Sequence, residues 1–191
     1  MKFILLLLII VICMALTVRG DEIENAHLPK HEYVNSDTGL YFRDSPSLNG
    51  NIVDLLPFAK KVRVLKRGCG DDGNWKKVKV DGAKGYVFGE YLQEENPFDE
   101  MDFLGKWIVT AYSHTGSACA NGNMPSEGYT IACNSLPFGT EIYISEVGFR
   151  TVEDRGPDWM GNEWCDLYIT NYHDCVIWGA QSKDIWIVKE N

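Results

Sequence analysis

Short apolar runs alternate with turn residues over the first half of the chain, from Tyr33 to Leu92. The alternation is clearest in Trp75–Val80, where lysines flank Val78 and Val80. Short strands separated by glycine-rich and asparagine-rich turns are typical of a small all-β barrel. The predicted strands lie in residues 39–43, 52–56, 62–65, 75–80 and 85–88.

An acidic segment that contains Pro97 interrupts this pattern, and it predicts a linker over residues 94–103. Strand-like runs then resume, and they predict a second β domain over residues 104–190. The predicted strands are residues 105–112, 128–132, 140–144, 149–153, 164–170 and 185–188. The one helix candidate is 171–178, with Asn171 as its N-cap and Gly179 as its stop. The fold class predicted is therefore all-β, with two domains in series.

The strand-like run 164–170 carries the most informative residues of the second domain. Side chains alternate between the faces of a strand, so Cys165 and Leu167 suit a core, and Asp166 and Tyr168 lie on the other face. A second carboxylate, Asp154, lies twelve positions before Asp166. Acidic residues beside aromatic rings are a common arrangement for the cleavage of sugar chains.

The first twenty residues predict a secretory signal peptide, residues 1–20. Lys2 precedes an uninterrupted apolar run that ends near Thr17, and small residues at Val18 and Gly20 suit cleavage. The alternative is an uncleaved membrane anchor, although the run is shorter than the roughly 20 apolar residues that span a bilayer comfortably. The prediction is a secreted, extracellular protein without stable membrane insertion after cleavage.

Four of the cysteines beyond the signal lie in the second domain: Cys119, Cys133, Cys165 and Cys175. In a secreted chain this clustering predicts two disulfides, and the local pairs Cys119–Cys133 and Cys165–Cys175 are the first expectation among three connectivities. Zinc is the alternative, but no close C-x-x-C pair is present, so no metal site and no cofactor are predicted. Cys69 is left unpaired within the chain.

The formal charge of −9 makes nucleic acid an improbable partner. The excess is concentrated in the C-terminal part, where residues 98–191 hold 14 Asp/Glu against 5 Lys/Arg. A solvated acidic surface explains this on composition alone, and a site that uses acids for chemistry is the sharper alternative.

The first domain resembles bacterial-type SH3 domains over residues 33–93. Residues 39–47 are similar to the family's Leu-x-Val-Arg-x-x-Pro-Ser signature, and residues 85–92 are similar to its closing Gly-Tyr/Trp-Val-x-x-x-Tyr-Leu, with Trp75 between them. The resemblance implies a small SH3-like barrel. Domains of this family often target cell-wall-cleaving enzymes to the wall.

The second domain resembles the three-aspartate (3D) domain, which is related to the catalytic barrel of membrane-bound lytic transglycosylase A. The motifs that carry the resemblance occur in the family's order: residues 110–112, 131–134, 136–140, 152–156 and 166–168. The resemblance implies a six-stranded double-psi β-barrel that acts on peptidoglycan or a related amino-sugar polymer.

The same resemblance implies the site residues. Asp154 matches the middle aspartate of the family and Asp166 the last, whereas Asn134 stands near the place of the first. Asn134 can bind a sugar hydroxyl but cannot titrate. Asp166 is the expected acid/base and Asp154 the residue that tunes it. Substrate-binding roles are expected for Thr110, Tyr112, Tyr168, Asn134 and the loop residue Trp159.

Each of these residues also has an ordinary structural explanation. Asp154 before Arg155-Gly156-Pro157 suits a turn, and tryptophans more often fill cores than stack on sugars. Asp is depleted in strands, which weakens the structural explanation for Asp166. Two functions therefore remain open: a lytic transglycosylase-like enzyme, favoured by the pair of aspartates, and a non-catalytic polysaccharide-binding module, favoured by Asn134. A secreted effector that binds a protein is a third possibility without specific support.

Overall fold

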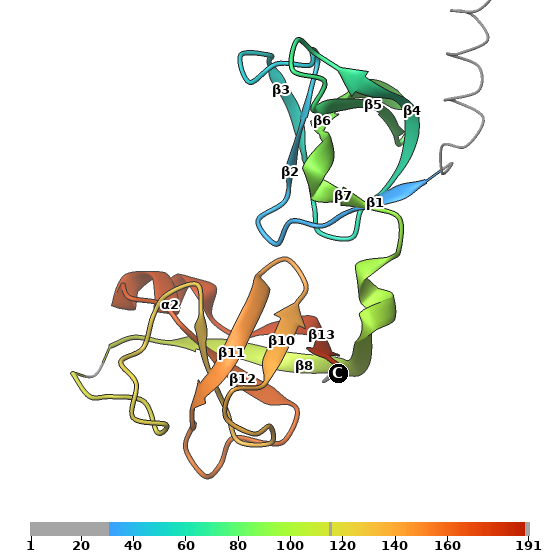
Figure 1. The fold of residues 1–191 in the computed structure, drawn as a ribbon. Coiled ribbons are helices and arrows are strands. Elements are labelled where there is room, and N and C mark those ends of the chain that lie inside the picture. Colours follow the sequence, from blue (N-terminus) through green and yellow to red (C-terminus); the bar gives the residue numbers. More distant parts are fainter. Residues whose placement is uncertain (1–30, 115, 190–191) are drawn as a thin grey trace, which may run out of the picture. The chain divides into compact units, whose positions relative to one another are not determined.

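The computed structural model describes residues 31–114 and 116–189 of the chain. These residues form two compact units, which divide mainly between Glu94 and Glu95 (Figure 1). An antiparallel SH3-like sheet is followed by a closed six-stranded barrel and one short helix. The predicted all-β fold class is confirmed. The predicted signal peptide lies outside the described residues.

The first unit is a seven-stranded sheet in the order β3-β2-β6-β5-β4-β1-β7. All of its recorded strand pairs are antiparallel. Strands β1 and β7 are additions to the predicted set, because strands of three and two residues carry too little alternation to be seen. The strands are β1 (Glu32–Val34), β2 (Leu40–Arg43), β3 (Ile52–Leu56), β4 (Lys61–Cys69), β5 (Trp75–Val80), β6 (Ala83–Phe88) and β7 (Leu92–Gln93), with the 3₁₀ turn η1 (Gly89–Tyr91) before β7.

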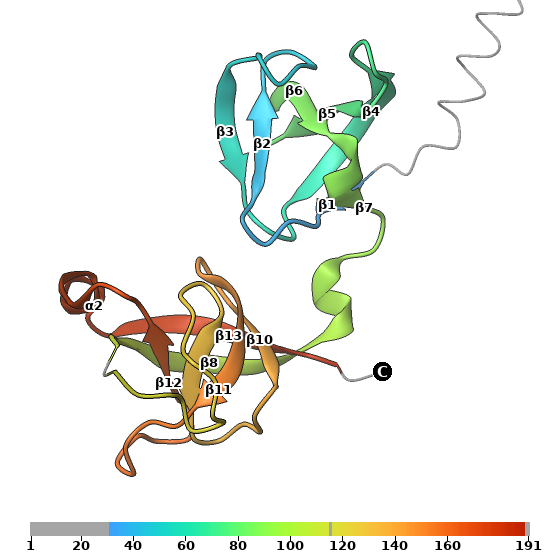
Figure 2. The ribbon, with the colours of Figure 1, turned by 60° about the vertical axis from the view of Figure 1, so that its left-hand side comes forward.

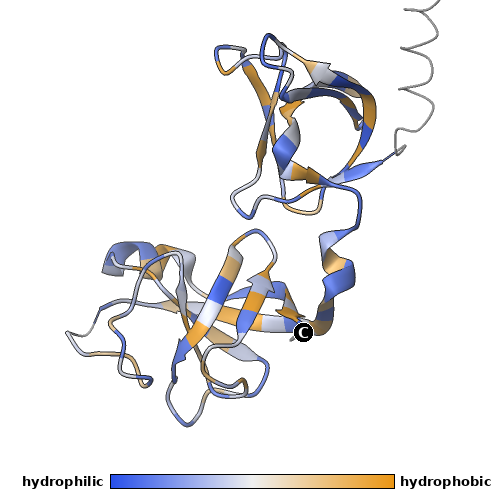
Figure 3. Cartoon of the chain, viewed as in Figure 1, coloured by the Kyte–Doolittle hydropathy of each residue, from blue (hydrophilic) through white to orange (hydrophobic). Residues whose placement is uncertain are grey.

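The alternation in β5 places its apolar side chains in the core of this unit. Trp75, Val78 and Val80 are buried, and Lys79 is exposed. The same banding of hydrophobic and hydrophilic residues runs along the strands of both units in Figure 3. Gly85 is required by packing, since a Cβ there would lie 2.6 Å from the Arg43 carbonyl oxygen and from the Phe42 ring. This close approach explains the glycine that opens the closing SH3-like motif.

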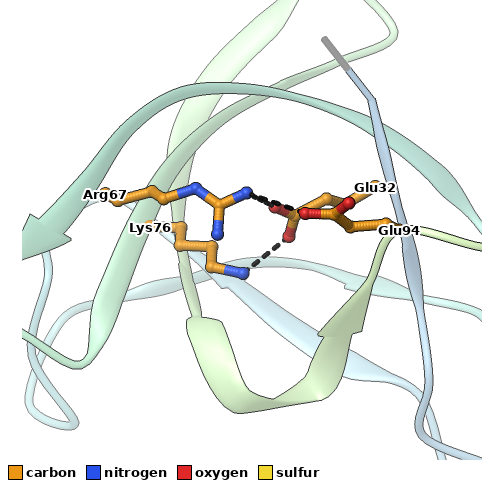
Figure 4. Close-up of polar contacts among 4 residues, drawn as sticks. All are labelled: Glu32, Arg67, Lys76 and Glu94. Carbon is orange, nitrogen blue, oxygen red and sulfur yellow. Dashed lines mark hydrogen bonds and ion pairs between the residues drawn. The ribbon is translucent and has the colours of Figure 1, made fainter. Parts of the chain in front are cut away.

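A buried carboxylate joins three strands of the first unit. Glu32 on β1 has a side chain only 1% exposed, and it accepts hydrogen bonds from Arg67 on β4 at 2.5 Å and Lys76 on β5 at 2.6 Å (Figure 4). Arg67 also lies 3.6 Å from Glu94. A buried carboxylate is tolerated when it is paired and fully hydrogen-bonded, so this cluster fixes β1 against the rest of the sheet.

The second unit is a closed barrel in the order β10-β11-β9-β12-β8-β13, and β10 pairs with β13 to complete the ring (Figure 2). Two pairs, β11 with β9 and β12 with β8, are parallel, and the remaining pairs are antiparallel. Its elements are η2 (Pro97–Glu100), β8 (Met101–Tyr112), β9 (Thr130–Cys133), β10 (Glu141–Ile144), β11 (Gly148–Asp154), β12 (Trp164–Tyr168), α2 (Tyr172–Trp178) and β13 (Gln181–Val188).

Strand β12 follows the predicted alternation at Cys165, Asp166 and Leu167, whereas Tyr168, which was expected on the open face, is only 5% exposed. Cys165 and Leu167 are 0% and 4% exposed and belong to the core cluster inside the barrel. Asp166 therefore lies on the outer face of the barrel wall. Helix α2 also begins and ends as predicted: the Asn171 side chain accepts a hydrogen bond from the His173 backbone, and Gly179 ends the helix with φ of 64°.

The expected disulfides are not formed. All five cysteines among the described residues are free thiols. The expected partner of Cys133 was Cys119, but Cys133 instead lies directly opposite Cys165 on the neighbouring strand. Cys119 sits on the outer side of the barrel, where Tyr112 and Asp154 are its neighbours. Closeness along the chain is a poor guide here, because strand pairing brings distant cysteines together.

Candidate functional site

Strand register brings both predicted carboxylates to one level of the barrel wall. Asp166 on β12 is paired with Ala132 on β9, and Asp154 on β11 is aligned with the same alanine. On its other side, Asp166 is aligned with Thr110 on β8. Residues paired in register share a face of a sheet. We call Asp154, Ala132, Asp166 and Thr110 the carboxylate row. At about 4.8 Å per strand, the backbones of the two aspartates are about 10 Å apart.

A β-bulge gives Asp154 its place in the row. Val152 is aligned with Ile131 and Asp154 with Ala132, so Glu153 is an extra residue opposite a regular strand. In an unbulged strand Glu153 would be aligned with Ala132, and Asp154 would turn toward the core. A bulge of this kind re-aims side chains and is frequent beside functional sites.

Asp166 is half-buried and has a short chain of hydrogen-bond donors. Trp164 Nε1 donates to Thr110 Oγ1 at 2.9 Å, and the Thr110 hydroxyl donates to Asp166 Oδ1 at 2.9 Å. The Cys165 carbonyl oxygen is the other acceptor near this hydroxyl, but it lies at 3.4 Å, so Asp166 receives the shorter hydrogen bond. No lysine or arginine forms an ion pair with Asp166 in the ranges that the structure describes.

Burial raises the pKa of Asp166 above its usual value, and the negative charge of Asp154 adds to this rise. The hydrogen bond from Thr110 acts in the opposite direction, because it favours the ionised form. The net direction is upward. Asp166 is thus a carboxyl group that keeps its proton to higher pH than an exposed aspartate.

Asp154 has a different environment, with three hydrogen-bond donors around it. Oδ1 accepts from the backbone N–H groups of Ala120 at 2.8 Å and Arg155 at 2.9 Å, and Oδ2 accepts from the Tyr112 hydroxyl at 3.1 Å. Three donors suit an acceptor-only, ionised carboxylate. Asp154 therefore holds the loop around Ala120 and supplies a negative charge to the row.

The bulged residue, Glu153, was not predicted as part of the site. Its side chain is 6% exposed and accepts hydrogen bonds from Thr130 at 2.6 Å and from Asn123 at 2.8 Å. Burial acts to raise its pKa, but the hydrogen bonds, including one from Asn121, bring the pKa below its usual value. Glu153 thus anchors the same loop as Asp154. Two consecutive residues of a regular strand point to opposite faces, so only the bulge allows Glu153 and Asp154 to hold the same loop. The alternation of apolar and polar residues in the sequence does not reveal a bulge.

Tyr112 lies between Asp154 and Tyr168. Its ring meets that of Tyr168 edge to face, with centroids 5.4 Å apart, while its hydroxyl reaches Asp154. Burial raises the pKa of Tyr112, and the charges of Asp154 and Asp166 act in the same direction. The phenol therefore keeps its proton over the whole physiological range and acts as a donor.

Two further predicted residues lie outside the row. The Asn134 side chain accepts from Gly156 N at 3.0 Å and donates to the Pro157 carbonyl at 3.1 Å, so it clamps the turn after Asp154. Trp159 is 71% exposed and meets Trp164 edge to face at 5.5 Å. The role of Trp164 was missed, although its spacing of two from Asp166 already placed both on one face.

The first unit contains a pocket of about 370 Å³ that the sequence did not predict. Aromatic and apolar side chains form one part of its wall, and two consecutive aspartates form another. Its lining residues are Pro46, Ser47, Leu48, Asp71, Asp72, Trp75 and Phe88. An apolar wall with a few polar groups is typical of a ligand pocket.

Comparison with known proteins identifies the class of the first unit. The bacterial SH3 domain family matches residues 38–93. This match suggests cell-wall binding and leaves the second unit without a family assignment. No curated protein matches the chain.

Neither a membrane-spanning helix nor a metal centre is found in the parts of the chain that the structure describes. No helix there has the length and apolar character needed to cross a bilayer. No group of three or more histidine, cysteine, aspartate or glutamate side chains lies close enough together there to hold a metal ion.

Proposed function

We propose that this chain is a secreted protein that binds the cell wall and cleaves its glycan strands. Residues 1–20 serve as the signal peptide, 33–93 as the wall-binding SH3 module, 94–103 as the linker and 104–190 as a 3D domain with a double-psi barrel. The partner is peptidoglycan or a related amino-sugar polymer. The SH3 family match and the apolar pocket of the first unit support the binding part.

The observation that carries the catalytic part is the state of Asp166. It is a half-buried carboxyl group with a raised pKa and, among residues 31–114 and 116–189, without a cationic partner, and it is in register with Asp154 across a single alanine. A general acid that works near neutral pH needs such a shift, because an exposed aspartate has already lost its proton. Structural ion pairs shift a carboxyl pKa downward instead.

The reaction that fits one acidic carboxyl is that of a lytic transglycosylase. Asp166 donates its proton to the glycosidic oxygen as the bond from that oxygen to the anomeric carbon breaks. The resulting carboxylate then takes the proton of the sugar's 6-hydroxyl while that oxygen attacks the anomeric carbon. The product is a 1,6-anhydro sugar, no water is consumed, and Asp166 ends in its starting state.

The neighbouring residues assist this cycle. Asp154 holds the pKa of Asp166 up through its charge and stabilises the positively charged, oxocarbenium-like transition state. Thr110 orients the Asp166 carboxyl through its hydrogen bond to Oδ1, so Oδ2 is the oxygen left to carry the proton. Trp159 and the half-buried ring of Tyr112 offer aromatic surface for sugar rings, whereas Tyr168 is buried and packs against Tyr112.

The test is direct. The purified chain is incubated with insoluble peptidoglycan, and the soluble products are analysed by mass spectrometry. The proposal predicts muropeptides with 1,6-anhydro ends. These are lighter than the reducing-end products of a hydrolase by the mass of one water molecule, about 18 Da. Products with reducing ends would replace the transglycosylase by a hydrolase. Release of no products would remove the enzymatic proposal.

A non-catalytic wall-binding protein is the second candidate, and Asn134 favours it. The amide that stands near the family's first aspartate is engaged with Gly156 and Pro157 and cannot titrate. In that case the protein should sediment with insoluble peptidoglycan and release nothing. The enzymatic proposal requires both sedimentation and release, so one assay separates the two.

A further inference from the structure

Two cysteines face each other inside the barrel. Cys133 on β9 and Cys165 on β12 are register partners in an antiparallel pair, and both are 0% exposed. Residues directly opposite in such a pair have Cα atoms about 4.5–5.5 Å apart. Disulfide-bonded cysteines have Cα atoms at about 4.4–6.8 Å, so the backbone of this pair already satisfies the distance that a bridge requires.

The two thiols are also in contact with each other. A side-chain hydrogen bond joins Cys133 and Cys165, and Cys133 Sγ lies 3.4 Å from the Ser135 hydroxyl. The hydrogen bond from Cys165 is the main cause that lowers the pKa of Cys133 to about 6, and the hydroxyl of Ser135 adds to it. The pKa of Cys165 is raised correspondingly. Cys133 is thus the nucleophilic member of the pair, since the thiolate is the reactive form.

We propose that Cys133 and Cys165 form a disulfide that joins β9 to β12 when the chain matures in an oxidising compartment. The oxidant is a low-molecular-weight disulfide such as oxidised glutathione. The Cys133 thiolate attacks one of its sulfurs and releases one thiol. Cys165, after losing its proton, attacks the Cys133 sulfur of the mixed disulfide and releases the second thiol. Two protein thiols are oxidised, and one small disulfide is reduced to two thiols.

The bridge lies next to the carboxylate row. Cys133 follows Ala132 and Cys165 precedes Asp166, so a covalent link between them fixes the register that aligns Ala132 with Asp166. A slip by one residue would send every side chain of a strand to the opposite face. Because both sulfurs are buried, exchange has to take place while the barrel closes. The inference is independent of the proposed glycan chemistry.

The remaining cysteines of the second unit have other neighbours. Cys175 on α2 donates to the Ile169 carbonyl at 3.5 Å, and Cys119 lies beside Tyr112. Neither is paired in register with Cys133 or Cys165. We therefore expect Cys119 and Cys175 to remain free thiols in the bridged protein.

Peptide mapping of the unaltered chain is the first test. The chain is refolded in a mixture of oxidised and reduced glutathione, free thiols are alkylated, and the protein is digested without reduction. Cleavage after glutamate and before aspartate separates all four cysteines of the second unit. Glu127 and Glu141 flank Cys133, and Asp166 and Asp174 separate Cys165 from Cys175.

The expected result is one linked pair of peptides that contain Cys133 and Cys165, with Cys119 and Cys175 alkylated. Alkylated Cys133 or Cys165 in the oxidised, folded protein would overturn the proposal. A link from either of them to Cys119 or Cys175 would overturn it as well.

Thermal unfolding with and without a reductant is the second test. A bridge that closes a loop of about 30 residues should raise the unfolding temperature of a unit of this size by roughly 15–30 °C, so reductant should lower it by that amount. The matched double variant Cys119→Ala/Cys175→Ala should keep this shift, and Cys133→Ala/Cys165→Ala should lose it. A shift that persists in the latter variant would contradict the assignment. If that variant does not fold, the peptide map decides.

Discussion

The two units each withdraw a carboxylate from water, and they treat its charge in opposite ways. Glu32 in the first unit is 1% exposed and is held between Arg67 and Lys76 (Figure 4). Asp166 in the second unit is half-buried, lacks a cationic partner among the described residues, and is in register with a second acid across one alanine.

The difference separates a structural role from a chemical one. A compensated charge holds strands together, and its removal takes from the largely buried Lys76 the carboxylate that pairs with it. An uncompensated carboxyl group costs stability when it ionises, and it retains a proton that it can donate. Substitution at the two positions should therefore affect different properties of the protein.

The largest expected effect is on catalysis by Asp166→Asn. The amide keeps the shape of the side chain but cannot donate a proton to the glycosidic oxygen, so release of muropeptides should fall about 10²–10⁴-fold. Product release from peptidoglycan measures it. Asp174→Asn, which changes an exposed acid on α2, is the matched control and should cleave normally. Full activity of Asp166→Asn would exclude Asp166 as the acid.

The same variant should not be less stable at neutral pH. The pKa of Asp166 is raised in the folded protein, so the unfolded chain loses this proton first, and the native state loses stability as pH rises through that range. Asp166→Asn lacks this loss of stability, because an amide does not ionise. Its unfolding temperature should equal or exceed that of the unaltered protein at pH 7, and the difference should vanish below about pH 3.8, where both states of the aspartate are protonated.

The next effect is on stability, by Glu32→Ala. Removal of one member of a buried ion cluster should cost about 3 kcal/mol in the free energy of unfolding of the first unit. Asp81→Asn is the control: Asp81 pairs with Lys60 at 2.7 Å but is 77% exposed, so its loss should cost less than about 1 kcal/mol. Denaturant unfolding measures both. Equal costs for the two variants would show that burial of Glu32 does not set its contribution.

The smallest expected effects are shifts in the pH profile of cleavage. Activity of a general acid falls as pH rises through its pKa. Asp154→Asn removes a charge that raises the pKa of Asp166, so the fall should move to lower pH. Thr110→Val removes a hydrogen bond that favours the ionised form, so the fall should move to higher pH, and Thr110→Ser should restore it. Shifts in the same direction for Asp154→Asn and Thr110→Val would contradict this electrostatic account.

Sequence periodicity predicts which face of a strand a side chain occupies better than it predicts which strands pair. It placed Cys165 and Leu167 in the core, put Asp166 on the opposite face, and gave the caps of α2 correctly. These features depend on residues close together in the chain. It could not give the pairing of Cys133 with Cys165, because strand order is set by the packing of the whole barrel.

The roles of Asn134 and Glu153 also depend on contacts with distant parts of the chain, which the sequence did not predict. The place of Asn134 in the motif order suggested a contact with substrate, yet its side chain clamps a backbone turn at Gly156 and Pro157. Glu153 is itself the extra residue of β11 relative to β9. Such an alignment of two residues against one can be recognised only when the pairing of the two strands is known.

The bulge at Glu153 lets two consecutive acids serve the same face of the barrel. Without Glu153, Asp154 would follow Val152 directly and would still stand opposite Ala132, so both aspartates of the row would keep their face. The loss would fall on the loop, because Asn123 and Thr130 would lack the carboxylate that accepts their hydrogen bonds. A designer who transplants the pair of acids onto another barrel could therefore omit the insertion only by supplying a second anchor for that loop.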